Sequence, residues 1–243
     1  MTKQDIEIKT VDGVAEAGLF MPSGKPKAGV ILYMDIFGPR PGLDEMASRL
    51  AGEGYGVLVP DLFYRFGEYE RFPAKTGMAE EASRNILRGM LSETSQAMTI
   101  ADTGAFLDTL AAHGMTGLAG TVGYCMGGAR ALNAAAAYPG RVGAAASLHG
   151  GGLASDAPDS PHLAAASIKG RIYVGSAGVD ASFPPEQSAR LAQALREAEV
   201  DYMIENYVGM KHGWCVPDHG VFDPEGAERH WKRLITFFDE ALG

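Results

Sequence analysis

The stretch Gly-Tyr-Cys-Met-Gly-Gly at residues 123–128 decides the fold of this chain. An apolar run over 119–124 leads into it and predicts a buried strand, and small residues over 127–138 predict a helix after it. A strand, a tight turn bounded by glycines and a helix present the central side chain above the strand end. Cys125 is therefore a candidate nucleophile, although a buried cysteine in a glycine-rich turn would give the same pattern.

Strands and helices alternate on both sides of this turn. Strands are expected at 4–10 and 14–21, as a hairpin, and then at 28–34, 56–60, 119–124, 142–148, 171–175 and 202–207. Helices are expected at 43–53, 80–90, 94–113, 127–138, 185–198 and 225–242, with an irregular stretch over 61–79. This order predicts a single α/β domain over 1–243, with a mostly parallel central sheet and helices on both faces. Ligands of such sheets bind at the carboxyl ends of the strands.

Composition excludes several classes of function. The 243 residues are 46% apolar and include 32 glycines, enough for one large core with many tight turns. A net charge of −9 argues against a nucleic-acid partner. The polar N-terminus has no signal-peptide core, and no apolar run reaches the length of a membrane span. Because two cysteines make no disulfide framework, we expect a cytoplasmic protein with reduced thiols and no membrane partner.

Two polar residues that follow later strands complete a catalytic arrangement. Asp180 comes after the apolar strand at 171–175, and His212 comes after the strand at 202–207. The chain order of nucleophile, acid and histidine is that of α/β-hydrolases. We predict that His212 takes the thiol proton of Cys125 and that Asp180 orients the imidazole.

Attack on a carbonyl also requires two backbone donors for the oxyanion. The N–H of Met126, directly after the nucleophile, is expected to supply one. The loop after the strand at 28–34 is expected to supply the other, through the N–H of Ile36.

The remaining histidines have weaker signals. His149 ends a strand beside three glycines, so it either lines the pocket or packs next to it. The others are expected on surface helices or loops, namely His113, His162, His219 and His230.

Taken together, these residues resemble the dienelactone hydrolase family of α/β-hydrolases. The resemblance spans nearly the whole chain and rests on five motifs: Asp-Ile-Phe-Gly at 35–38, Gly-Tyr at 54–55 leading to Pro-Asp-Leu at 60–62, the turn at 123–128, Asp180 before its proline pair, and His-Gly at 212–213. A cysteine in place of serine is itself a mark of the family. The resemblance implies an α/β-hydrolase fold and a monomeric hydrolase without metal or cofactor, acting on small ester or lactone substrates.

Two positions depart from the family pattern. The family has a glutamate that contacts the resting thiol, and this chain has the shorter Asp35, which either keeps that role or is a solvated strand-end carboxylate. The family also holds a substrate carboxylate with two arginines. Here Arg84 matches one of them and Val216 stands in place of the other, with Arg88 one turn after Arg84. Either arginine could equally lie on a solvent face.

Two residues near His212 are also candidates for the pocket. Trp214 is expected to form a pocket wall or to belong to the core. Cys215 has a spacing that could suggest a metal ligand, but no second pair of soft ligands lies nearby in sequence. We therefore expect Cys215 to be a small buried apolar residue and predict no metal site.

Two other functions stay open on sequence alone. The same nucleophile and oxyanion donors can serve an amide or an activated phosphoester, because one fold supports several reactions. A reactive thiol can also belong to a non-catalytic sensor or binding module. An ordered acid and histidine favour the esterase or lactonase, since a sensor does not need them.

Overall fold

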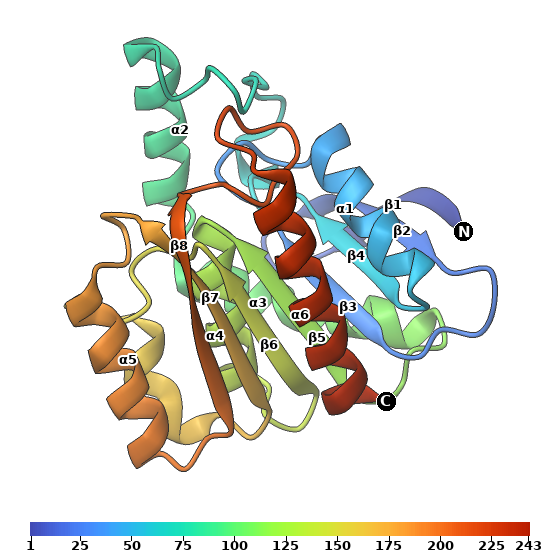
Figure 1. The fold of residues 1–243 in the computed structure, drawn as a ribbon. Helices are drawn as coiled ribbons and strands as arrows, with labels where there is room; N and C mark the ends of the chain where they lie inside the picture. The colour runs from blue at the N-terminus through green and yellow to red at the C-terminus, as the bar shows by residue number, and fades with distance from the viewer.

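The computed structural model describes residues 1–243 and contains one eight-stranded sheet (Figure 1). Its strands are β1 (Thr2–Lys9), β2 (Val14–Met21), β3 (Gly29–Tyr33), β4 (Gly56–Pro60), β5 (Ala119–Tyr124), β6 (Val142–Leu148), β7 (Arg171–Val179) and β8 (Tyr202–Lys211). Their order across the sheet is β1-β2-β4-β3-β5-β6-β7-β8. β1 and β2 form an antiparallel hairpin, β2 pairs antiparallel with β4, and all later pairs are parallel. The predicted α/β class with a mostly parallel sheet is confirmed.

The four central strands carry the core. Every residue of β3, β4, β5 and β6 is buried, as the continuous apolar runs predicted for strands that are covered on both faces. The edge strand β1 alternates with polar residues and is mostly exposed. The carboxyl ends of β3, β5, β6, β7 and β8 lie along one edge of the sheet, where a site can form.

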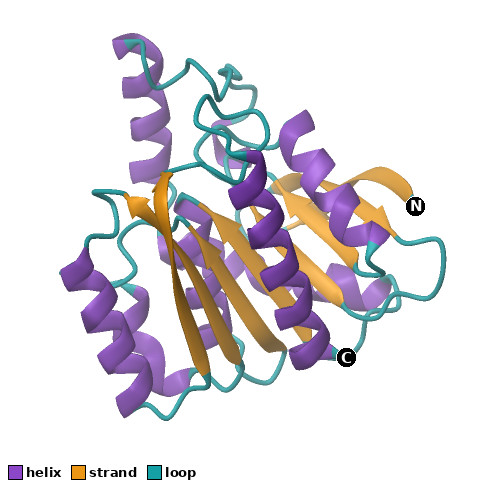
Figure 2. Cartoon of the chain, in the orientation of Figure 1, coloured by secondary structure: helices purple, strands orange, loops and turns teal.

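Helices cover both faces of this sheet (Figure 2). They are α1 (Pro41–Gly52), α2 (Glu81–Glu93), α3 (Gln96–Ala112), α4 (Met126–Ala137), α5 (Pro185–Glu197) and α6 (Pro224–Leu242), with short 3₁₀ segments η1 (Tyr64–Phe66) and η2 (Pro161–Ser167). α1 and α6 lie together on one face, where Arg49 bonds Glu228 and stacks on Trp231. α3 and α4 pack together on the other face.

The helix α2 stands apart from these layers. It extends beyond the carboxyl ends of the strands and, with the loop before it, forms a cap over that edge (Figure 1). Only Ser83, Leu87 and Met90 of α2 are buried. The cap therefore lies mainly around the strand ends and adds little to the hydrophobic core.

Strands β7 and β8 run further than the sequence pattern predicted. They were expected to end at 175 and 207, but pairing continues to Val179 opposite Lys211 after a shift in register beyond Ala177. The shift occurs at Gly178, where a side chain would meet the backbone of β8. Val179 and Lys211 are partners at the ends of their strands. The residues that follow them, Asp180 and His212, therefore lie side by side.

No helix of the structure combines the length and the apolar character that a membrane crossing requires.

Candidate active site

The turn between β5 and α4 holds Cys125 in a conformation that is rare for a residue with a side chain. Its φ is 55° and its ψ is −118°, and such a backbone is tolerated mainly at functional turns. A side chain at Gly123 would overlap the carbonyl of Gly127, and one at Gly127 would overlap the end of β3. The two glycines therefore allow the start of α4 to lie against the strands, and the half-buried Cys125 lines a cavity above them.

His212 lines this cavity and is held by Asp180. Nδ1 of His212 lies 2.7 Å from Oδ2 of Asp180. The backbone N–H and the hydroxyl of Ser182 both donate to Oδ1 of the same carboxylate, at 2.8 and 2.6 Å. With Nδ1 held by Asp180, Nε2 is the imidazole nitrogen that remains for the neighbouring Cys125 thiol. The structure thus brings the three predicted triad residues together.

The electrostatics of the pair follow from these contacts. Burial by itself lowers the pKa of His212, but Asp180 and the Cys125 thiol outweigh it and raise that pKa to about 10. Burial would raise the pKa of Asp180, but the hydrogen bonds with His212 and Ser182 hold it below its usual value. The arrangement therefore favours an imidazolium beside an ionised carboxylate at neutral pH.

The two predicted oxyanion donors line the same cavity. Neither the N–H of Ile36 nor that of Met126 donates to an acceptor within the protein. In contrast, the N–H of Cys125 is already used, because it donates to Leu148 O and to Nδ1 of His149. Two N–H groups at this edge, those of Ile36 and Met126, are thus free to donate, one from the β3 loop and one from the start of α4.

Asp35 does not have the contact that the family pattern suggested. Its carboxylate is fully buried and accepts from the N–H of Phe37, from two nitrogens of Arg40 and from Nε2 of His219. Both oxygens are therefore engaged away from Cys125, and neither of the two alternatives drawn from sequence describes the residue. Burial would raise the pKa of Asp35, but His219 and Arg40 lower it.

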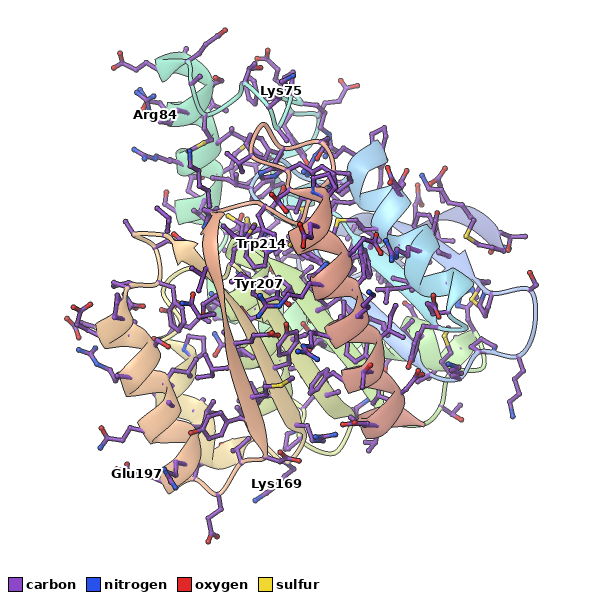
Figure 3. The ribbon with its side chains drawn as sticks, in the orientation of Figure 1. Lys75, Arg84, Lys169, Glu197, Tyr207 and Trp214 are labelled. Carbon is purple, nitrogen blue, oxygen red and sulfur yellow. The ribbon has the colours of Figure 1, made fainter.

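The predicted substrate-binding residues Arg84 and Trp214 do not line the cavity. Arg84 lies on α2 (Figure 3), and its guanidinium reaches only the carbonyl of Met78. Arg88, one turn later, lines the cavity. Trp214 is fully buried and stacks on Tyr207 at 4.7 Å, behind the site (Figure 3). Arg84 and Arg88 lie on the same face of α2, one turn apart along its axis, and the motif alone does not specify which of the two turns is level with the cavity.

The cavity has a volume of about 660 Å³, enough for a small organic substrate. Apolar side chains from the β3 loop, the cap, α4 and the loop between β8 and α6 form much of its wall: Ile36, Phe37, Ala74, Met78, Leu91, Met126, Ala129 and Val221. Lys75, Arg88 and Arg130 also line it, whereas no aspartate or glutamate does. Cations therefore surround this cavity in a protein of net charge −9.

Sequence reasoning placed on the surface one histidine that the structure buries and another that it places, half-buried, in the cavity wall. His230 is completely buried, with Nε2 3.0 Å from the hydroxyl of Tyr124. His219 lines the cavity and pairs with Asp35, 184 residues away in sequence. No local sequence pattern predicts such a contact, because the two residues lie in separate loops that come together only when the sheet forms. Cys215 is buried, as expected.

No group of three or more histidine, cysteine, aspartate or glutamate side chains is arranged to hold a metal ion.

The fold and the cavity define an enzyme of the α/β-hydrolase class. A solved structure from Klebsiella pneumoniae superposes with a TM-score of 0.85 at 24% identity, covering 98% of both chains. A promiscuous phosphotriesterase resembling dienelactone hydrolases, from metagenomic libraries, superposes with a TM-score of 0.81 at 22% identity, covering 100% of this chain and 99% of its own. At these identities the likeness establishes the fold.

The sequence comparisons go further. Residues 15–242 match the dienelactone hydrolase family. A carboxymethylenebutenolidase of Rhodococcus opacus is 30% identical over 220 residues, covering 88% of this chain and 81% of the relative. The chain belongs to the dienelactone hydrolase family and is a hydrolase, as the motifs predicted.

Proposed function

We propose that this protein hydrolyses ester or lactone bonds of small molecules through a Cys125–His212–Asp180 triad and a thioester intermediate. The observation that carries the proposal is the meeting of Cys125, at its strained turn, with an imidazole held by Asp180 in one cavity. Membership of a family whose relatives include a carboxymethylenebutenolidase supports the bond type.

The chemistry follows from the geometry. The thiol proton of Cys125 already resides on Nε2 of His212, in a thiolate–imidazolium pair, and the thiolate attacks the carbonyl carbon. The oxyanion accepts hydrogen bonds from the free N–H groups of Ile36 and Met126. When the intermediate collapses, the carbon–oxygen bond breaks and the leaving oxygen takes the proton from His212. The acyl group is then held as a thioester on Cys125.

Water releases the acyl group by the reverse sequence. His212 takes a proton from the attacking water, the carbon–sulfur bond breaks, and the thiolate leaves as the acid product forms. Asp180 remains ionised throughout and stabilises the imidazolium of His212. In a lactone, the leaving oxygen stays attached to the product.

The charges around the cavity favour an anionic substrate, such as an ester or lactone that carries a carboxylate. Arg130 is almost fully buried, its Nε has no partner, and its other contacts are neutral oxygens of Thr94, Ser95 and Thr99. Burial lowers the pKa of Arg130 to about 10, which leaves it cationic at neutral pH. With Arg88 and Lys75 on the same cavity, the site offers positive charge without a competing carboxylate.

The triad is tested by intact mass spectrometry and product release with p-nitrophenyl acetate. We expect an acyl adduct and turnover in the wild type, neither in Cys125→Ala, and measurable but lower turnover in Cys125→Ser, because a hydroxyl needs stronger activation by His212. Full turnover in Cys125→Ala would overturn the proposal. Fast labelling of the thiol without turnover of any ester or lactone in a panel would favour the sensor instead.

The charge preference is tested by comparing mono-p-nitrophenyl succinate with p-nitrophenyl butyrate. Arg88→Gln is expected to lower kcat/KM for the succinate by about threefold, as for an exposed charge pair, and to leave the butyrate unchanged. Arg84→Gln is the matched control, since it lies one turn away and outside the cavity. If Arg88→Gln and Arg84→Gln changed kcat/KM equally for both esters, the proposed preference for anionic substrates would be contradicted.

A further inference from the structure

His149 lies directly between the proposed nucleophile and the proposed base. It follows the last residue of β6 and is almost completely buried. Its φ is 39°, and only Cys125 and Glu199 share this left-handed conformation among the residues other than glycine. Histidine enters this region more readily than most residues, but at a cost that surrounding contacts must offset. Two of the three strained residues of the chain are therefore neighbours at one site.

The first contact of His149 is with the backbone of the catalytic turn. Its Nδ1 accepts the N–H of Cys125 at 3.1 Å. The same N–H also lies 3.2 Å from the carbonyl of Leu148, so two consecutive residues of the β6 end hold it. These contacts tie the turn to the end of β6 and engage the Cys125 N–H.

The second contact is with the base. The imidazole of His149 meets that of His212 edge to face, with ring centroids 4.8 Å apart. The same ring also meets Trp214 edge to face, with centroids 5.4 Å apart, and Trp214 is itself packed on Tyr207. His149 thus connects the ring of His212 to the packed rings of Trp214 and Tyr207, and this packing limits the movement of His212.

The buried position also determines the form of the side chain. Burial lowers the pKa of His149 well below its usual value, and the charges of His212 and His219 lower it further. A neutral imidazole whose Nδ1 accepts a hydrogen bond carries its proton on Nε2. That Nε2 is buried without a partner, a cost that the two contacts of the ring must offset.

We propose that His149 is a positioning residue that holds the nucleophile and the base in register, with Nδ1 fixing the backbone of Cys125 and the ring supporting His212. The inference rests on the proposed function, in which these two residues react with the substrate. His149 itself does not contact the reacting atoms, since it is not part of the cavity wall.

Two half-replacements separate the two contacts. In His149→Asn, Oδ1 can accept the Cys125 N–H and the residue type tolerates the left-handed backbone, but the ring is lost. In His149→Phe, a ring remains against His212 but no acceptor does. His149→Ala loses both contacts, and His113→Asn is the matched control on an exposed histidine far from the site.

The rate of alkylation of Cys125 by iodoacetamide is measured from pH 5 to 10 beside kcat and KM for p-nitrophenyl acetate. We expect His149→Ala to lower kcat and the alkylation rate at neutral pH about 10- to 100-fold with KM changed less than threefold. His149→Asn and His149→Phe are each expected to recover part of this loss. A single label per chain reports on Cys125 because Cys215 is buried.

The proposal fails if His149→Ala keeps kcat and the alkylation profile within twofold of the wild type. It also fails if neither half-replacement exceeds His149→Ala in a folded protein. Should His149→Ala not fold, the comparison of the two half-replacements with the wild type decides: wild-type values in both would overturn the proposal. Alkylation requires no ester, so a wild type that lacks esterase activity refutes the proposed function separately.

Discussion

Two aspartate–histidine pairs lie at the same edge of the sheet, and they differ in what else the carboxylate binds. In Asp180–His212 the atoms are 2.7 Å apart, and in Asp35–His219 they are 2.9 Å apart. Asp180 is otherwise bound only by Ser182, whereas Asp35 is also bound by two nitrogens of Arg40. Arg40 in turn binds Asp218 through two further contacts.

This difference separates the pair that we propose for catalysis, Asp180–His212, from a pair that supports the structure, Asp35–His219. The charge of Asp180 is available to His212, whose pKa rises to about 10 beside the Cys125 thiol. The charge of Asp35 is shared with a guanidinium in a bidentate pair, which is stronger and more directional than a neutral contact. A short distance between an acid and an imidazole therefore does not by itself define a catalytic pair; the remaining partners of the acid and the presence of a nucleophile do.

Removing each imidazole gives the largest contrast. His212→Ala is expected to lower kcat for p-nitrophenyl acetate by about 10³-fold, because proton transfer to and from the substrate is lost. His219→Ala is expected to lower it by less than about tenfold, since the ring faces the cavity but no nucleophile. Steady-state kinetics of the two purified variants measure both effects. Comparable losses in the two variants would show that His219 belongs to the catalytic chemistry.

Removing the charge of each carboxylate is expected to affect different properties: activity for Asp180 and stability for Asp35. Asp180→Asn is expected to lower kcat by about 10³- to 10⁴-fold, because the imidazole loses its orientation and charge partner. Asp35→Asn is expected to lower the free energy of unfolding by about 3 kcal/mol, since it leaves Arg40 buried without half of its counter-charge. Urea denaturation and kinetics on both variants check this, and an Asp35→Asn protein as stable as the wild type would contradict the structural role.

The pH dependence of stability gives the smallest and most specific effect. The folded pKa of His212 lies above its ordinary value of 6.5, so its contribution to stability is complete below pH 6.5 and is lost as the pH rises through about 10. The difference in unfolding free energy between the wild type and His212→Asn should therefore decrease between pH 6.5 and 10. The exposed His113→Asn variant serves as control, and a difference that stays constant over that range would refute the shift.

Much of the fold and of the proposed site was predictable because its signals are local. The buried runs of β3 to β6 and the glycines around Cys125 are patterns of only a few residues, and each predicts its own local structure. Asp180 and His212 were found because residues that follow parallel strands share one edge of a sheet. The ends of β7 and β8 were placed too early, because a shift of register at Gly178 depends on the partner strand and not on the strand itself.

The sequence by itself determined the class of fold, the family, and the three residues of the proposed triad, since each follows from a short pattern and from chain order. Only the tertiary structure decided that Asp35 is held by Arg40 and His219, that Arg88 and not Arg84 lines the cavity, and that His149 contacts both Cys125 and His212. These contacts depend on side-chain direction and on loops far apart in sequence, which are brought together only when the sheet and its helices pack.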